Sequence, residues 1–284
     1  MIKMTVPFEN DTGNIVRKLA RKSLKSEKRR NLMVVIAVAL ASCLICFSIV
    51  MALSTRQIEK NHVEDTYEAV YTRITEEDVS TLKGLDDFSR VGEYYMLAVE
   101  PAEQGYNASY IYCDEETMYI ARDQMKLLEG RLPQKEDEVV VSRYFLSNYA
   151  ADAGIGEKVM LSSESFHGEY TVTGIMEGYK EKEVNGSSIL LSKEALKGWS
   201  GYDPADYRAY VHFKNEQQMD ETELTARSRE IAKEYQLEMP IMNLSYMKFY
   251  KQPVNVSMLA LVAGIAVLVI IGGYVVIPVS YTHL

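Results

Sequence analysis

The sequence is poor in cysteine and histidine, and it lacks the short motifs that mark the common catalytic sites. Three cysteines and four histidines occur among 284 residues. There is no G-x-x-x-x-G-K-[ST] loop for phosphate, no H-E-x-x-H for zinc and no G-x-S-x-G elbow for a nucleophilic serine. The sequence therefore predicts no enzyme and no cofactor. It assigns no catalytic, cofactor-binding or metal-binding residue, and it identifies no ligand-binding residue.

The few reactive side chains are also poorly placed for chemistry. Cys43 and Cys46 lie inside an apolar stretch with no cation to stabilise a thiolate. Cys113 stands alone in the polar part of the chain, so one chain offers no disulfide framework. The adjacent carboxylates at 114–116 and 136–138 are interpreted as solvated surface. No histidine has another ligand at the spacing of a metal site. The histidines are His62, His167, His212 and His283.

Long apolar stretches are limited to two, Leu32–Leu53 and Met258–Ile277, and neither contains a charge. At about 1.5 Å per residue they reach roughly 33 and 30 Å, which matches the hydrocarbon thickness of a bilayer. A soluble core helix of this length would show a polar face, and neither stretch does. Each gains on the order of 4 to 7 kcal/mol on insertion. We therefore predict two transmembrane helices.

Positive charge predominates only before the first apolar stretch. Residues 1–31 carry nine Lys and Arg against three acids, whereas residues 54–253 carry 22 against 37. Because Lys and Arg stay on the cytoplasmic side, we predict a cytoplasmic N-terminus and an extracytoplasmic middle segment. A basic run beside a spanning segment favours membrane lipid over nucleic acid as its partner. Residues 13–31 have a short apolar face, typical of an interfacial helix or a solvated tail.

The first apolar stretch is longer than the core of a signal peptide, so we predict an uncleaved anchor. The second is followed by Pro278, and residues 279–284 resemble translated sequencing-adapter sequence, so we expect an N-terminal fragment. The predicted organisation is a basic cytoplasmic segment at 1–31, a transmembrane helix at 32–53, an extracytoplasmic α/β domain with helical stalk ends at 54–253, a second transmembrane helix at 254–277 and a non-native tail at 278–284.

The middle segment has the pattern of a mixed α and β domain. The β-rich runs are Tyr67–Ile74, Glu93–Val99, Ser109–Cys113, Glu138–Ser142, Lys158–Ser162, Tyr170–Met176, Ser188–Leu191 and Tyr207–Phe213. The helical candidates are Glu76–Leu85, Arg143–Ala153, Lys193–Trp199 and Glu216–Tyr235. A helical stalk is predicted at Ser54–Thr66. Asn185-Gly186 indicates a two-residue hairpin, and Gly130 is expected to end a helical turn.

Tyrosine is unusually frequent relative to phenylalanine, 20 against seven. Six tyrosines fall between residues 94 and 119, where either sheet packing or a binding surface would explain them. We favour packing, because half-buried sheet faces commonly carry Tyr. Tyr246, Phe249 and Tyr250, just before the second apolar stretch, are expected to form an aromatic belt at the membrane interface.

Four stretches of the middle segment occur in an order known from one family. They are Leu127-Leu-Glu-Gly-Arg-Leu-Pro133, Glu138-Val-Val-Val-Ser142, Gly154-Ile-Gly-Glu-Lys-Val159 and Tyr170-Thr-Val-Thr-Gly-Ile175. Together with the basic start at 14–31, they resemble the extracytoplasmic domain of FtsX-like, MacB-type ABC transporter permeases. The resemblance covers residues 13–277. It implies an α+β membrane protein in which two transmembrane helices bracket a mixed α/β domain of MacB periplasmic core type.

The resemblance also implies partners and a location. Such permeases typically have four spans and work with an ABC ATPase at the cytoplasmic face, a second permease copy or homologue, and membrane lipid. They are multi-pass proteins of the bacterial cell membrane that couple ATP hydrolysis to export or mechanical work outside it. Arg131 would pair with a carboxylate or bind a partner.

The alternative function is a two-span sensor with a signal-binding outer domain. A membrane-anchored surface enzyme is disfavoured by the missing catalytic motifs.

Overall fold

The computed structural model describes residues 15–19, 22, 28–122, 124–178, 181–251, 261 and 264–265. The chain divides into two compact units, one of Met1–Gln57 with Ser257–Leu284 and one of Ile58–Val256. The second unit contains the whole sheet, and we call it the core domain. Of the predicted cytoplasmic segment at 1–31, only residues 15–19, 22 and 28–31 are described, and the predicted tail at 278–284 lies outside the described residues.

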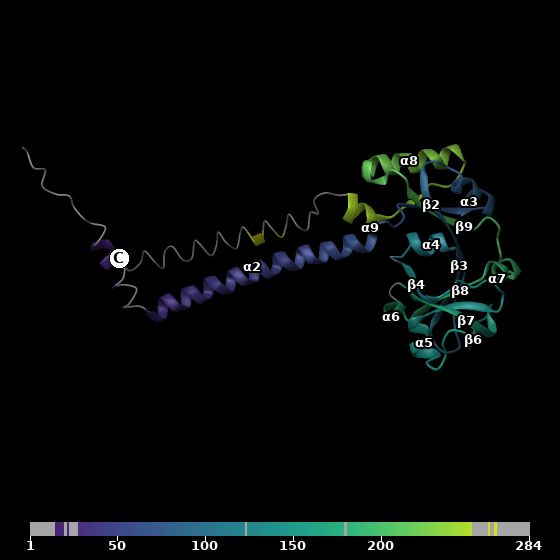
Figure 1. The fold of residues 1–284 in the computed structure, drawn as a ribbon, viewed down its shortest axis with the longest axis horizontal. Coiled ribbons are helices and arrows are strands. Elements are labelled where there is room, and N and C mark those ends of the chain that lie inside the picture. The colour runs from purple at the N-terminus through teal and green to yellow at the C-terminus, as the bar shows by residue number, and fades with distance from the viewer. Residues whose placement is uncertain are drawn as a thin grey trace, which may run out of the picture. The chain divides into compact units, whose positions relative to one another are not determined.

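Helix α2 runs without a break from Lys28 to Val63 (Figure 1). The predicted continuation of the first apolar stretch into a helical stalk is therefore confirmed as far as Val63. Within the described part of the chain, one helical segment, Ser42–Val63, is long and apolar enough to cross a membrane. It begins later than the predicted span at 32–53. The predicted second span at 254–277 lies outside the described residues except for positions 261, 264 and 265.

The core domain is built on a ten-stranded mixed sheet with the order β10-β1-β9-β2-β3-β8-β5-β7-β4, and β6 pairs with β7. The pairs β3–β8 and β5–β7 are parallel, and the remaining pairs are antiparallel. The strands are β1 (Ala69–Ile74), β2 (Phe88–Pro101), β3 (Asn107–Cys113), β4 (Met125–Gly130), β5 (Glu138–Ser142), β6 (Lys158–Ser162), β7 (His167–Gly178), β8 (Gly186–Leu191), β9 (Tyr207–Phe213) and β10 (Ile241–Met242).

Both faces of the sheet are covered, so central strands are apolar on both sides. Successive side chains of a strand point to opposite faces. In β5, Val139 and Val141 join the larger core cluster and Val140 joins the smaller one. Residues of α3, α5, α7 and α8 belong to the larger cluster, and α4 contributes Met118 and Ile120 to the smaller one. The helices are α3 (Glu76–Lys83), α4 (Glu115–Ile120), α5 (Arg143–Tyr149), α6 (Glu181–Val184), α7 (Lys193–Gly198), α8 (Glu221–Glu234) and α9 (Leu244–Tyr246), with short turns η1 (Glu216–Gln218) and η2 (Met247–Lys251).

The predicted helix at 216–235 is wrong in one respect, because it is two elements. The short turn η1 ends at Gln218, and Asp220 caps α8. The Asp220 carboxylate accepts the Glu223 N–H at 2.8 Å, and the Glu223 carboxylate accepts the Asp220 N–H at 3.0 Å. This reciprocal capping box fixes a helix start at Glu221. Asp220 and Glu223 have the sequence spacing of a capping box, which marks the start of this helix.

Two turn predictions are also wrong. Asn185-Gly186 does not close a hairpin, since Asn185 follows α6 with a left-handed φ of 47° and β8 is separated from β7 by β5. Asn is one of the few residues that tolerate this conformation after a helix. Gly130 ends strand β4 and not a helical turn, because β4 pairs with β7 along its length. Pairing with β7 outweighs the helix-compatible sequence before Gly130.

Candidate functional site

The chain enters and leaves the core domain at the same corner of the sheet. The entering strand β1 pairs with the exit strand β10, with Ala69 opposite Met242. Asn243, which follows β10, donates its backbone N–H to the Glu68 carbonyl at 2.8 Å and its side-chain amide to the Tyr67 carbonyl at 3.0 Å. Any displacement of the entering or the leaving segment therefore acts on the same small group of residues.

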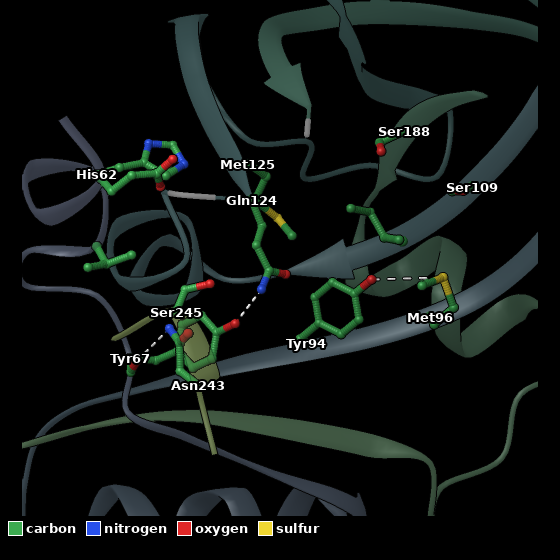
Figure 2. Close-up of a pocket in the computed structure, with 13 residues that line it drawn as sticks. His62, Tyr67, Tyr94, Met96, Ser109, Gln124, Met125, Ser188, Asn243 and Ser245 are labelled. Carbon is green, nitrogen blue, oxygen red and sulfur yellow. Dashed lines mark hydrogen bonds between the residues drawn. The ribbon is translucent and has the colours of Figure 1, made fainter. Parts of the chain in front are cut away.

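A hollow of about 350 Å³ opens at this corner (Figure 2). Its wall combines the end of α2, the residues after β10, the loop after α4, and strands β2, β3 and β8. Figure 2 shows side chains from these separate segments surrounding one space, among them His62, Tyr67, Tyr94, Met96, Asn243 and Ser245.

The hollow is lined by polar side chains, among them the carboxylate of Glu59, and by apolar side chains such as Val63 and Ile111. Gln124 donates its amide N–H to the Tyr67 hydroxyl, and Tyr94 donates its hydroxyl to the Met96 thioether at 3.8 Å (Figure 2). Burial raises the pKa of Tyr94, so its hydroxyl stays protonated.

A buried carboxylate ties the entering segment to β9. Glu68 is fully buried, and its Oε2 accepts the Phe213 N–H at 2.8 Å. His212 Nδ1 lies 2.7 Å from Glu68 Oε1 and 3.1 Å from the Thr66 carbonyl. Both of these neighbours are acceptors, so Nδ1 must carry a proton. Burial alone would lower the pKa of His212, but the hydrogen bond to Glu68 and its charge raise that pKa overall.

A second buried carboxylate holds the leaving segment. Glu216 Oε2 accepts the Tyr246 hydroxyl at 2.5 Å and lies 3.1 Å from Lys251 Nζ. We call these three residues the Glu216 cluster. Tyr246 is 1% exposed and stacks on Tyr250 at 5.1 Å between ring centroids. The predicted aromatic belt is therefore wrong for Tyr246, because its hydroxyl is bound by a carboxylate inside the core domain.

The sequence comparison with protein families decides the class of this fold. The model of the MacB-like periplasmic core domain matches residues 32–229. The chain belongs to this family. It therefore carries the extracytoplasmic domain of an ABC transporter permease of the MacB and FtsX type, and the predicted mixed α/β domain of MacB type is confirmed. No curated protein matches the chain in sequence.

The solved structures that are similar to this chain include two from transporters. The extracellular domain of the noncanonic ABC-type transporter YknZ from Gram-positive bacteria is 15% identical with a TM-score of 0.45, and the match covers 63% of this chain and 100% of that one. The periplasmic region of MacB from Actinobacillus actinomycetemcomitans is 11% identical with a TM-score of 0.45, covering 65% and 91%. The family assignment rests on the family match, because both TM-scores are below 0.5.

The stretches that carried the resemblance meet in the MacB-like core domain. Arg131 pairs with Glu138, which confirms the first of the two roles considered for Arg131. The interpretation of residues 136–138 as solvated surface is wrong for Glu138, since it is buried in β5. Asp114 in the other acidic run caps α4 by accepting the Thr117 N–H at 2.9 Å. Gly156 has a left-handed φ of 90° just before β6.

The tyrosine-rich stretch serves mainly as core of the MacB-like domain. Tyr94, Tyr95, Tyr106 and Tyr110 are buried, and Tyr119 is 46% exposed. Packing was therefore the correct interpretation for most of them, and Tyr94 additionally lines the hollow. Cys113 is buried, and burial raises the pKa of its thiol. Among the described residues no group of three or more His, Cys, Asp or Glu is placed to hold a metal ion.

The carboxylates that hold the two ends of the core domain were not predicted from the sequence. Glu68 and His212 are 144 positions apart, and Glu216 and Lys251 are 35 apart. Neither pair forms a local motif. The one available signal was Glu68, an acidic residue directly before the apolar residues Ala69–Tyr71, because a carboxylate buried at such a position needs a partner.

Proposed function

We propose that this chain is part of a permease that couples ATP hydrolysis by a partner ABC ATPase to export or mechanical work outside the membrane. The observation that carries the proposal is the joining of the entering and leaving segments at one corner, through Asn243, Tyr67 and Glu68. A domain held this way follows the movement of either segment. The uneven distribution of charge supports a cytoplasmic N-terminus with residues 54–253 outside the bacterial cell membrane.

The proposed partners are an ABC ATPase at the cytoplasmic face, a second permease copy or homologue, and membrane lipid. The chain itself is proposed to be no enzyme, in keeping with the missing phosphate loop. Its 284 residues without an ATPase are expected to transport nothing, because the proposed source of free energy is ATP hydrolysis by that partner.

Co-purification tests the coupling. The permease expressed from its complete gene in the native host, with an affinity tag, should retain an ABC ATPase through mild detergent extraction. The purified 284-residue chain should neither bind nor hydrolyse ATP. Recovery of a signalling output protein in place of an ATPase would favour the two-span sensor. Saturable binding of ATP by the chain at micromolar concentration would contradict the permease assignment.

A further inference from the structure

Residues 247–251 form a π-helical turn, η2, directly after α9. The π form has hydrogen bonds between residues five apart, is rare, and frequently occurs at functional positions. In this chain it brings two side chains five positions apart to one carboxylate. Tyr246 donates its hydroxyl to Glu216, and Lys251 donates to both the carboxylate and the backbone carbonyl of Glu216.

An α-helix would not allow this arrangement. Five residues correspond to about 1.4 turns of an α-helix, so Tyr246 and Lys251 would point to different sides of the axis. In the π turn both reach Glu216, whose side chain is 8% exposed while that of Lys251 is 7% exposed. The unusual backbone and the Glu216 cluster thus depend on each other.

We propose that the Glu216 cluster acts as a latch. By this we mean that Glu216, by binding both Tyr246 and Lys251, holds Met247–Lys251 in the π-helical form. The turn is π-helical while Lys251 is bound and becomes α-helical when Lys251 is released. This change rotates the C-terminal end of the turn, at Lys251, about the helix axis relative to Glu216. The predicted second span at Met258–Ile277 begins seven residues further on. The inference concerns the core domain alone and does not depend on a partner ATPase.

The two ends of the latch differ in how firmly they are held. Tyr246 is anchored by burial and by stacking on Tyr250, so Lys251 is the end that moves. The buried Glu216–Lys251 pair gains Coulomb energy but requires both charges to be desolvated, so its net stabilisation is small. Lys60 of α2 lies 5.0 Å from the Tyr250 ring centroid. This contact gives the entering helix a direct connection to the latch.

The latch is tested by distance measurement between two spin labels on the full chain in lipid nanodiscs. Cys43, Cys46 and Cys113 are replaced by Ala, and labels are placed through Glu234→Cys, at the exposed end of α8, and Gln252→Cys. The test variants are Lys251→Met and Glu216→Gln. The matched control is Lys248→Met, because Lys248 lies exposed in the same turn and faces the Phe249 ring.

We expect the parent and Lys248→Met to give the same distance distribution. Lys251→Met and Glu216→Gln should add a second population in which the distance between the two labels differs by several ångströms. The upper limit of this difference is about 10–12 Å, set by the helix diameter. Identical distributions in all four proteins would overturn the proposal, and so would an equal shift in Lys248→Met. If Glu216→Gln does not fold, Lys251→Met decides, since it removes only the moving contact.

Discussion

Arg131 holds Glu138 with two hydrogen bonds, 2.8 Å from Nη1 to Oε2 and 2.6 Å from Nη2 to Oε1. The same carboxylate accepts the backbone N–H groups of Gln134 and Lys135 at 2.8 and 3.3 Å. This planar fork joins the end of β4 to the start of β5 across the intervening loop. Two of the stretches on which the family resemblance rests are thus parts of one structural unit.

The core domain should fold without the apolar stretches. Both of its core clusters draw only on residues between Val63 and Met247, and Ile58–Val256 separates as a compact unit. A fragment of residues 54–253 is therefore expected to be soluble and to melt cooperatively when followed by circular dichroism. A broad melt without a defined midpoint would show that the domain needs the rest of the chain.

Replacing Arg131 should make this fragment sensitive to acid. Arg131 and the backbone N–H groups lower the pKa of Glu138 from 4.5 to about 2. A depressed pKa contributes stability above pH 4.5 that is lost as the pH falls toward 2. Arg131→Met should therefore raise the pH of half-unfolding, measured by fluorescence between pH 7 and 2. Arg131→Lys should lie between it and the parent, because Lys cannot form the fork. Equal midpoints in all three would contradict the role of the pair.

Two glycines with the same backbone conformation should differ in how they tolerate alanine. Gly130 and Gly105 have φ values of 84° and 86°. A Cβ at Gly130 would lie 2.2 Å from the Thr173 carbonyl oxygen, whereas a Cβ at Gly105 would meet nothing within 4 Å. Gly105→Ala should cost about 1–2 kcal/mol for the left-handed conformation alone. Gly130→Ala should lower the free energy of unfolding by about 1–3 kcal/mol more, because its Cβ would also clash with the Thr173 carbonyl oxygen. Urea unfolding measures both, and equal losses would refute the close approach.

The fold was predictable where local pattern and tertiary environment agree. The predicted strands at 138–142, 158–162 and 207–213 coincide with β5, β6 and β9, because their alternating or β-branched residues suit a sheet face. Strand β4 was not predictable. Its sequence Met-Lys-Leu-Leu-Glu-Gly suits a helix, and it becomes a strand only because β7 offers an edge to pair with.

His212 should make the fragment less stable as the pH rises. The pKa of His212 is raised above 6.5 in the folded state, so its contribution is fully present below pH 6.5 and is lost as the pH passes through the raised value. Each unit by which folding raises the pKa of His212 corresponds to about 1.4 kcal/mol in the free energy of unfolding. Burial also raises the pKa of Glu68. This shift likewise makes the fragment less stable as the pH rises, but at a lower pH than the shift of His212 does.

The measurement for His212 is urea unfolding between pH 5 and 9. His212→Gln keeps an amide donor for Glu68 but cannot titrate, so its stability should lie below that of the parent at pH 6 and approach it by pH 9. A difference that stays constant across this range would show that His212 does not gain a proton-dependent interaction on folding.

The candidate site was less predictable than the fold. Its two carboxylates, Glu68 and Glu216, receive their partners from distant strands and turns, and no spacing in the sequence reports such contacts. The π turn was equally hidden, since Met247–Lys251 depends on where Glu216 lies and not on its own composition. By contrast, the missing catalytic motifs and the charge asymmetry could be taken directly from the sequence.

The account depends most on the core domain lying across the membrane from the basic N-terminal segment, and cysteine labelling in whole cells tests this directly. In a background without Cys43, Cys46 and Cys113, Lys182→Cys places a thiol on exposed α6, and Lys25→Cys places one in the basic segment. An impermeant thiol reagent should label position 182 in intact cells and position 25 only after permeabilisation. Labelling of position 25 but not of 182 in intact cells would contradict the account.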